Sequence, residues 1–169
     1  MNQLEKKPTQ FQQLKENLFL SLYAWTKIPL IGFCGPRVIE ANGQRTVLKV
    51  PLNFRTRNHL GAMYFGALAV GSELCIAILA VKQIQASGLK IDFLFKDYKA
   101  EFLKRAEGDV HFICEQAAVV IDQINEAKTS TERINRTMTA YAIVPSVSAT
   151  EKVATFELTL SVKNRQKKA

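Results

Sequence analysis

The stretch from Ala62 to Val81 reads AMYFGALAVGSELCIAILAV, and its only charged side chain is Glu73, near the middle. A carboxylate buried without a partner is costly or keeps its proton at a raised pKa, so a residue retained there has a partner or a function. The preceding residues 58–61, NHLG, are typical of a turn that leads into a helix. We therefore expect the functional site between this turn and Glu73.

The same stretch has about the length of a transmembrane helix, roughly 20 residues. A carboxylate at the centre of a bilayer is expensive, and the flanking segments alternate like strands that need a soluble core. We therefore interpret the stretch as the core helix of a cytoplasmic protein without a membrane span. The N-terminal residues MNQLEKKPTQFQQLKEN lack the apolar core of a signal peptide. Cys34, Cys75 and Cys114 form no C-x-x-C pair, which favours a reducing compartment and argues against a zinc site.

The composition of the 169-residue chain, 47% hydrophobic and 22% charged, predicts one globular domain. Its net charge of +8 is unevenly distributed. Four cations fall within the last seven residues and predict a solvated tail: Lys163, Arg165, Lys167 and Lys168. Between Glu40 and Glu73 there is no acidic residue, and the cations there are Arg45, Lys49, Arg55 and Arg57. This segment is either an ordinary solvated edge or a positive field that attracts phosphate groups.

The periodicity of the sequence predicts a helix, a hairpin, the long helix and then several strands. An amphipathic helix is expected over residues 11–25, with Thr9 as its N-cap and Pro29 after its end. Asn42-Gly43 predicts a hairpin between strands 37–40 and 45–52. Gly88 is expected to end the long helix. Further strands are expected at residues 90–103 with a bend near Asp97, 110–116, 133–144 and 152–163, while 117–128 is compatible with a helix or a strand.

This order indicates an α+β fold in which an antiparallel sheet covers one long apolar helix. We divide the chain into an N-terminal helix and linker (1–30), a main domain (31–163) and a basic tail (164–169). Gly66 and Gly71 lie inside the long helix, where glycine is unfavourable. Close approach of the sheet or of a partner helix is therefore expected at these two positions.

A hairpin followed by a long buried helix and antiparallel strands resembles the layout of a single hotdog domain, over roughly residues 36–162. Residues 58–73 resemble the helix start of hotdog acyl-CoA thioesterases of the phenylacetyl-CoA and 4-hydroxybenzoyl-CoA types. Those carry an Asn, a Gly three residues later, a His-Gly-Gly that opens the helix and an acid nine residues after the His. Here Asn58, Gly61 and Glu73 match, and residues 64–66, YFG, stand at the His-Gly-Gly place. The chain is also similar to a hotdog branch with an Asn-His-Leu-Gly helix start and a later stretch like residues 101–106, EFLKRA.

The resemblance implies hydrolysis of acyl-CoA thioesters, with no metal and no cofactor beyond the coenzyme A of the substrate. Glu73 would be the general base or nucleophile, and the backbone amides of Phe65 and Gly66 would form the oxyanion hole. Asn58 would hold the water or the acid of a partner chain, or only form the turn. Tyr64 replaces a histidine that helps to align the substrate or water in related enzymes.

Contacts with the acyl-CoA substrate are expected from Arg55, Arg57, His59 and Gly61, with the arginines toward the phosphates. Ser72 and His111 are interpreted as structural residues. The N-terminal helix is expected to cover the pocket or an oligomer face, which would place Trp25 and Phe33 near an acyl tunnel.

Tyr64 and Glu73 are nine residues apart, which is about 13 Å of helix rise and too far for one thioester carbonyl to touch both ends. The acid and the oxyanion donors are therefore expected from two chains, with their helices antiparallel across a two-fold axis. The sequence thus predicts an obligate homodimer, or a dimer of dimers.

Two functions remain open at this point. Glu73 favours an acyl-CoA thioesterase, whereas Tyr64 favours a non-catalytic acyl-CoA-binding module with a regulatory or interaction role. An acyl-CoA hydratase would need an Asp–His pair that we do not find in the sequence. Nucleic-acid binding rests on the net charge alone.

Overall fold

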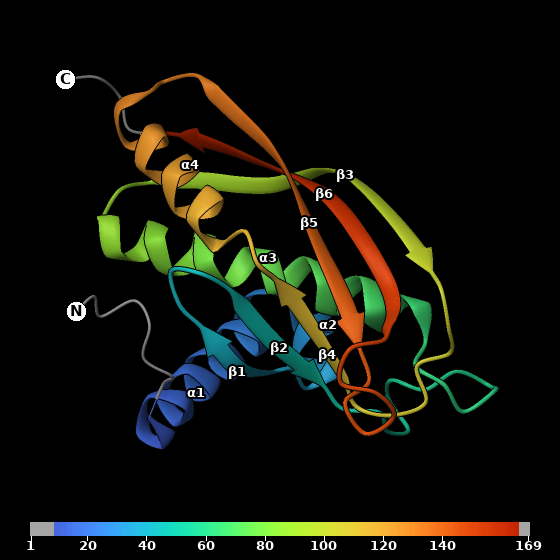
Figure 1. Ribbon diagram of the computed structural model, residues 1–169. Helices are drawn as coiled ribbons and strands as arrows, with labels where there is room; N and C mark the ends of the chain where they lie inside the picture. Colours follow the sequence, from blue (N-terminus) through green and yellow to red (C-terminus); the bar gives the residue numbers. More distant parts are fainter. Residues whose placement is uncertain (1–8, 166–169) are drawn as a thin grey trace.

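The computed structural model describes residues 9–165. The elements in this range are α1 (Gln10–Lys27), α2 (Pro29–Cys34), β1 (Arg37–Ala41), β2 (Thr46–Val50), α3 (Phe65–Ser87), β3 (Ile91–Phe102), β4 (Val110–Cys114), α4 (Ala117–Thr129), β5 (Arg133–Ile143) and β6 (Lys152–Asn164). The strands form one antiparallel sheet in the order β1-β2-β4-β5-β6-β3. Figure 1 shows this sheet curving around α3, with α4 packed against α3 and α1 beside β1. The predicted fold, an antiparallel sheet around one long apolar helix with an extra N-terminal helix, is confirmed.

Helix α3 is the core of the domain. It begins after Tyr64 and ends at Gly88, whose φ of 66° is a left-handed conformation that glycine adopts without strain. Sheet and helix approach closely at Gly71, because a Cβ there would lie 2.3 Å from the ring of Phe112. Among residues 9–165, α3 is also the one helix long and apolar enough to cross a membrane. Of its apolar 18-residue segment, 72% is buried inside the domain, as in the core helix of a globular protein.

Helix α1 closes one edge of the sheet. Thr9 is its N-cap, as predicted. The side chain of Gln13 donates a hydrogen bond to the carbonyl of Ile39, and the side chain of Asn17 bonds both the N–H and the C=O of Val38. These bonds occupy backbone groups on the open edge of strand β1, which prevents the addition of another strand there.

The N-terminal region differs from the expectation in two respects. The residues after Pro29 are not only a linker, because this proline opens the short helix α2. The apolar positions of α1 do not face the core, which the helix contacts through Leu20 and Ala24. The side chains that point outward instead are Phe11, Leu14, Leu18, Leu22 and Trp25.

The ambiguous segment 117–128 folds as helix α4. Val120, Ile124 and Ala127 are fully buried on one face of it. Buried Gln123 donates from its side chain to carbonyls of the β5 and β6 chain segments, which ties the helix to the sheet. Tertiary burial therefore overrides the weaker helix propensity of the β-branched residues.

Strand β3 forms the other edge of the sheet and pairs only with β6 among the described strands. The predicted bend is present as a register shift between Phe95 and Tyr98. There the carboxylate of Asp97 accepts a hydrogen bond from the N–H of Thr159. At the bulge, a hydrogen bond to a side chain thus replaces a backbone hydrogen bond between the strands, and the end of β3 changes direction.

Ion pairs remove part of the positive field predicted between residues 41 and 72. Arg45 pairs with Glu40 at 2.8 Å, and Lys49 pairs with Asp109 at 2.7 Å. Only Arg55, of the four predicted cations, keeps its guanidinium in a partly buried position without an ion pair.

The basic tail is ordered for longer than the sequence suggested. Lys163 lies in β6, and Arg165 pairs with Asp92 at 2.8 Å. Lys167 and Lys168 lie outside the described residues.

Candidate active site at the start of helix α3

Glu73 lies on the wall of a cavity of about 710 Å³ between α3, the edge strand β3 and the α1–α2 segment. Its carboxylate is partly exposed, so the expected full burial is not met within one chain. Apolar and aromatic side chains make up most of the lining: Tyr23, Ile28, Leu30, Ala69, Val70, Phe93, Leu94, Phe95 and Leu158. Gly66 and Tyr98 complete it. A carboxylate on the wall of an apolar cavity can act on the polar head of a ligand with a hydrocarbon tail.

The carboxylate of Glu73 has no hydrogen-bond or ion-pair partner among residues 9–165. Desolvation raises its pKa above the usual value of 4.5, which brings it closer to that of a base working near neutrality. Serine 72 is not available as an alternative nucleophile, because it is fully buried and its hydroxyl lies 2.9 Å from the carbonyl of Ala69. The structural interpretation of Ser72 therefore fits its surroundings.

Tyr98 is a site residue that the sequence did not reveal. Its hydroxyl lies 3.3 Å from that of Ser72, the residue next to Glu73 in the chain. Burial raises the pKa of Tyr98, and the charge of Glu73 adds to the increase, whereas the bond with Ser72 opposes it. Tyr98 therefore presents a neutral hydroxyl in the cavity that Glu73 also lines, able to donate a hydrogen bond to a ligand there.

The first turn of α3 presents two free amides. The N–H groups of Ala67 and Leu68 both reach the carbonyl of Tyr64, whereas those of Phe65 and Gly66 find no acceptor among the described residues. Such amides carry the positive end of the helix dipole and bind developing negative charge. The ring of Tyr64 lies over Gly66, where a Cβ would be only 2.5 Å from it.

The turn before α3 is formed as predicted. Asn58 accepts the N–H of Leu60 at 2.9 Å through its side-chain oxygen, and Gly61 has a φ of 81°, a value that favours glycine. Arg57 is exposed and forms an isolated bridge with Met63. Asn58 thus serves the turn with its oxygen, while its side-chain nitrogen donates to none of the described residues.

The predicted site residues fall into three separate concavities of one chain. Glu73 and Gly66 share the apolar cavity. Asn58, His59, Tyr64 and Phe65 line a neighbouring pocket of about 320 Å³, together with Phe102 of β3 and with Lys104 and Arg105. The last three belong to the stretch 101–106, which was noted for its resemblance but not predicted as part of the site. Arg55 lies in a third groove beside α1, together with Trp25. Gly61 and Arg57 line none of these three.

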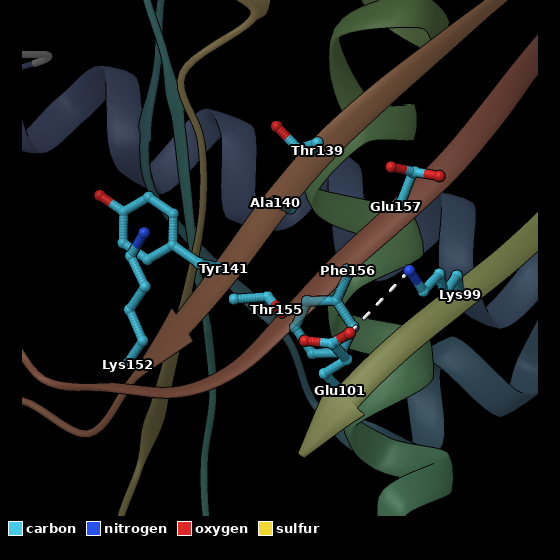
Figure 2. A pocket seen from close by; sticks show the side chains of 9 residues that line it. All are labelled: Lys99, Glu101, Thr139, Ala140, Tyr141, Lys152, Thr155, Phe156 and Glu157. Carbon is cyan, nitrogen blue, oxygen red and sulfur yellow. Dashed lines mark ion pairs between the residues drawn. The ribbon is translucent and has the colours of Figure 1, made fainter. Parts of the chain in front are cut away.

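Another hollow, of about 300 Å³, lies on the opposite face of the sheet, across β3, β5 and β6 (Figure 2). Lys99 lies 3.9 Å from Glu101, Lys152 lies over the ring of Tyr141, and the remaining carboxylate, that of Glu157, is exposed to solvent. It contains no unpartnered carboxylate in an apolar setting. The Glu73 cavity is therefore the better candidate for chemistry.

Solved structures share this architecture. A protein of unknown function from Chlorobaculum tepidum TLS superposes with a TM-score of 0.75 and 11% identity, over 90% of this chain and 97% of its own. A Pseudomonas aeruginosa protein described as a probable thioesterase has a TM-score of 0.70 and 19% identity, over 88% and 96%. A mutant thioesterase from the same organism has a TM-score of 0.63 and 13% identity, over 96% and 99%. No curated protein matches the sequence significantly.

The sheet wrapped around α3 and its likeness to these structures define a hotdog-fold domain. Within that fold, residues 16–162 match the domain of unknown function DUF4442, and the chain belongs to this family.

Proposed function

We propose that this protein is a cytoplasmic thioesterase that hydrolyses acyl-CoA thioesters. The observation that carries the proposal is the unpartnered carboxylate of Glu73 on the wall of an apolar cavity that is also lined by Gly66, whose helix amide is free. The apolar walls suit an acyl chain, and the carboxylate and amides suit the thioester carbonyl.

In the proposed reaction Glu73 takes a proton from water as the water oxygen attacks the thioester carbonyl. The developing oxyanion is stabilised by the amides of Phe65 and Gly66. Cleavage of the C–S bond releases coenzyme A as the thiolate, which takes up one proton, and the fatty or aromatic acid leaves as the second product. Tyr98 orients the carboxylate or the water through its hydroxyl. No further cofactor is required, because water is the only co-reactant.

The chemistry is proposed to need two chains. Gly66 and Glu73 are seven residues apart, about 10 Å along the helix, so one carbonyl cannot meet both from a single chain. Pairing of two β3 edges across a two-fold axis would set the α3 helices antiparallel and bring the start of one opposite Glu73 of the other. It would also cover Leu94, Tyr98 and Phe102, which are exposed on β3. We propose this homodimer, able to pair further into a dimer of dimers.

The coenzyme A part is proposed to lie over the pocket at the helix start. Asn58, His59 and Arg105 line that pocket, and Arg105 forms no ion pair among the described residues, whereas Lys104 pairs with Glu151. Exposed Arg57 lies on the adjoining turn. These cations would meet the phosphates. Arg55 faces another groove and would reach them only from a partner chain or after a change of rotamer.

One observation favours a non-catalytic acyl-CoA-binding module as the second candidate. The ring of Tyr64 packs against Gly66, where it would crowd a carbonyl that approaches this residue. A ligand could then fill the cavity without being placed for attack.

The deciding experiment is a thiol-release assay with acyl-CoA thioesters of different chain length and aromatic type, run on wild type and Glu73→Gln. Glu132→Gln, which changes an exposed glutamate in the connection between α4 and β5, is the matched control. The proposal expects turnover to be lost in Glu73→Gln while acyl-CoA binding persists. Saturable binding without turnover in all three proteins would select the binding module instead.

Complementation tests the two-chain site directly. Glu73→Gln and Gly66→Val are each expected to be inactive alone. In a mixture of equal amounts, half of the dimers combine one chain of each kind and contain one intact site, so about a quarter of wild-type activity should return. A mixture as inactive as its components would show that each chain forms its own site.

A further inference from the structure

Helices α1 and α2 carry an outward apolar surface that no described residue covers. Its largest members are between 53% and 70% exposed: Phe11, Leu14, Leu18, Leu22 and Trp25. At 100° per residue they fall within an arc of about 80°, opposite the buried Leu20 and Ala24. We call these five residues the α1 stripe. Leu30 and Phe33 of α2, 63% and 45% exposed, extend the apolar surface beyond the stripe.

A contiguous surface of this kind marks an interaction site rather than a scatter of single exposed residues. The junction between α1 and α2 is closely packed, because a Cβ on Gly32 of α2 would lie 2.8 Å from the indole of Trp25. The indole is thus packed on the backbone of α2 and still half exposed. Tryptophan in such a position is typical of the boundary between water and lipid.

The charges around the α1 stripe are positive. The ammonium of Lys15 lies 4.4 Å from the centre of the Phe11 ring, and Lys27 and Arg37 are exposed. The only acidic residue between positions 9 and 39 is Glu16, and its carboxylate is held by Lys82 at 2.6 Å. Within residues 9–39 the unpaired charge beside the stripe is therefore cationic.

A groove of about 610 Å³ runs along the stripe. Leu14 and Trp25 form its apolar side, and Arg37 and Arg55 form its cationic side. The guanidinium of Arg55 lies 5.8 Å from the ring centre of Phe33, and its Nε is buried without a hydrogen-bond partner. Apolar and guanidinium surfaces facing one groove match a molecule with a hydrocarbon part and a phosphate.

We propose that the α1 stripe docks on an anionic lipid bilayer, with phosphate head groups received by the cations along the groove. A second copy is disfavoured as the occupant, because a two-fold contact through the stripe would bring Lys15, Lys27 and Arg37 of both chains together. A bilayer with anionic lipids offers negative head groups to the cations and a hydrocarbon interior in which the stripe can be buried.

Docking would also connect the bilayer to the candidate active site. Tyr23, Ile28 and Leu30 belong to the same α1–α2 segment and line the Glu73 cavity. An acyl chain leaving the lipid surface would meet these residues first. This connection rests on the proposed thioesterase function, whereas binding to the bilayer does not.

The test is flotation of the full-length protein with phosphatidylcholine vesicles, with and without phosphatidylserine. Wild type is expected to float with the anionic vesicles only, and less so as salt is raised. Leu18→Gln combined with Leu22→Gln should weaken binding on the order of tenfold or more, because two exposed leucines lose their burial in lipid. Lys15→Gln combined with Arg37→Gln should weaken flotation with the phosphatidylserine vesicles and make the remaining binding less sensitive to salt.

Val147→Gln is the matched control, since Val147 is 68% exposed in the connection between β5 and β6, away from the stripe. It should bind vesicles like wild type. Thermal melting of each variant shows that the fold is retained. Wild type that fails to float with anionic vesicles, or a leucine variant that floats as well as wild type, would overturn the proposal. A leucine variant that instead lowers the oligomeric state in sedimentation velocity would assign the stripe to a contact between copies and overturn it as well.

Discussion

The two glycines of α3 should respond in opposite ways to the same substitution. At Gly71 a Cβ would lie 2.3, 2.4 and 2.7 Å from three atoms of the Phe112 ring, which is fully buried. At Gly66 the nearest atoms belong to the ring of Tyr64, which is 47% exposed and can turn away. Gly71→Ala therefore tests packing against the sheet, and Gly66→Ala tests access to the free amides.

The expected magnitudes follow from these contacts. Alanine gains about 1 kcal/mol over glycine inside a helix, whereas overpacking a core costs about 1–3 kcal/mol. Three ring atoms far inside contact distance place Gly71 at or above the upper end of that cost, so we expect a net loss of about 2 kcal/mol. For a chain of this size that lowers the Tm by about 4–8 °C. Gly66→Ala should change stability by less than about 0.5 kcal/mol.

Urea unfolding measures both variants, and thiol release measures their activity. Gly66→Ala should lose on the order of a hundredfold in kcat, because its methyl group occupies the approach to the oxyanion amides. Phe112→Leu should relieve Gly71→Ala, so that the double variant is more stable than the sum of the single losses by about 1 kcal/mol. A Gly71→Ala protein as stable as wild type would refute the close packing of α3 against β4.

Three further predictions concern ionisation and the sheet edge. Because the pKa of Glu73 is raised, the folded state binds the proton of this carboxyl more tightly than the unfolded chain does. The free energy of unfolding therefore falls as the pH rises from 4.5 through the raised pKa. In urea unfolding, Glu73→Gln should be more stable than wild type at neutral pH, and this advantage should be gone near pH 4.5. The hydrogen bond from Lys49 lowers the pKa of Asp109 below 3.8. The ionised carboxylate therefore stabilises the fold above pH 3.8, and this stabilisation is lost as the pH falls through the lowered pKa. Asp109→Asn should cost about 1 kcal/mol of stability at neutral pH and nothing in strong acid. Asn17→Ala leaves an N–H and a C=O of β1 unpaired and should cost about 2 kcal/mol in thermal melts, against little for Ser21→Ala.

Local signals in the sequence predict most of the fold. Asn42-Gly43 gives the hairpin between β1 and β2, Gly88 ends α3, and the bend near Asp97 appears at the register shift of β3. Helix α4 was ambiguous because β-branched residues oppose helix, and only burial of residues such as Val120 against the rest of the domain decides it. Which face of α1 meets the core was equally hidden, since it depends on polar side chains that bond β1.

The candidate site was visible in the sequence only where it violates a local rule. Glu73 stands out because a carboxylate interrupts an apolar run. Tyr98 gave no such signal, since its contact with Ser72 spans 26 residues of chain. The positive segment is reduced for the same reason, because Lys49 meets Asp109 across 60 residues. Interactions between distant residues decide these features, and a linear pattern does not contain them.

The two edges of the sheet explain why the proposed chemistry belongs to a dimer. Polar side chains from α1 already satisfy β1, so another strand could pair there only after the bonds of Asn17 were broken. Strand β3 is twelve residues long, has no such cover within the described chain and exposes Leu94 and Phe102. An open edge of that length would favour aggregation unless a partner covers it. Because β3 also forms a wall of the Glu73 cavity, the partner that covers this edge would at the same time desolvate the carboxylate and supply the second helix start. Leu94→Lys should therefore lower both the dimer fraction in sedimentation velocity and the thioesterase activity. A monomeric Leu94→Lys protein that keeps its activity would show that the chemistry does not need the dimer.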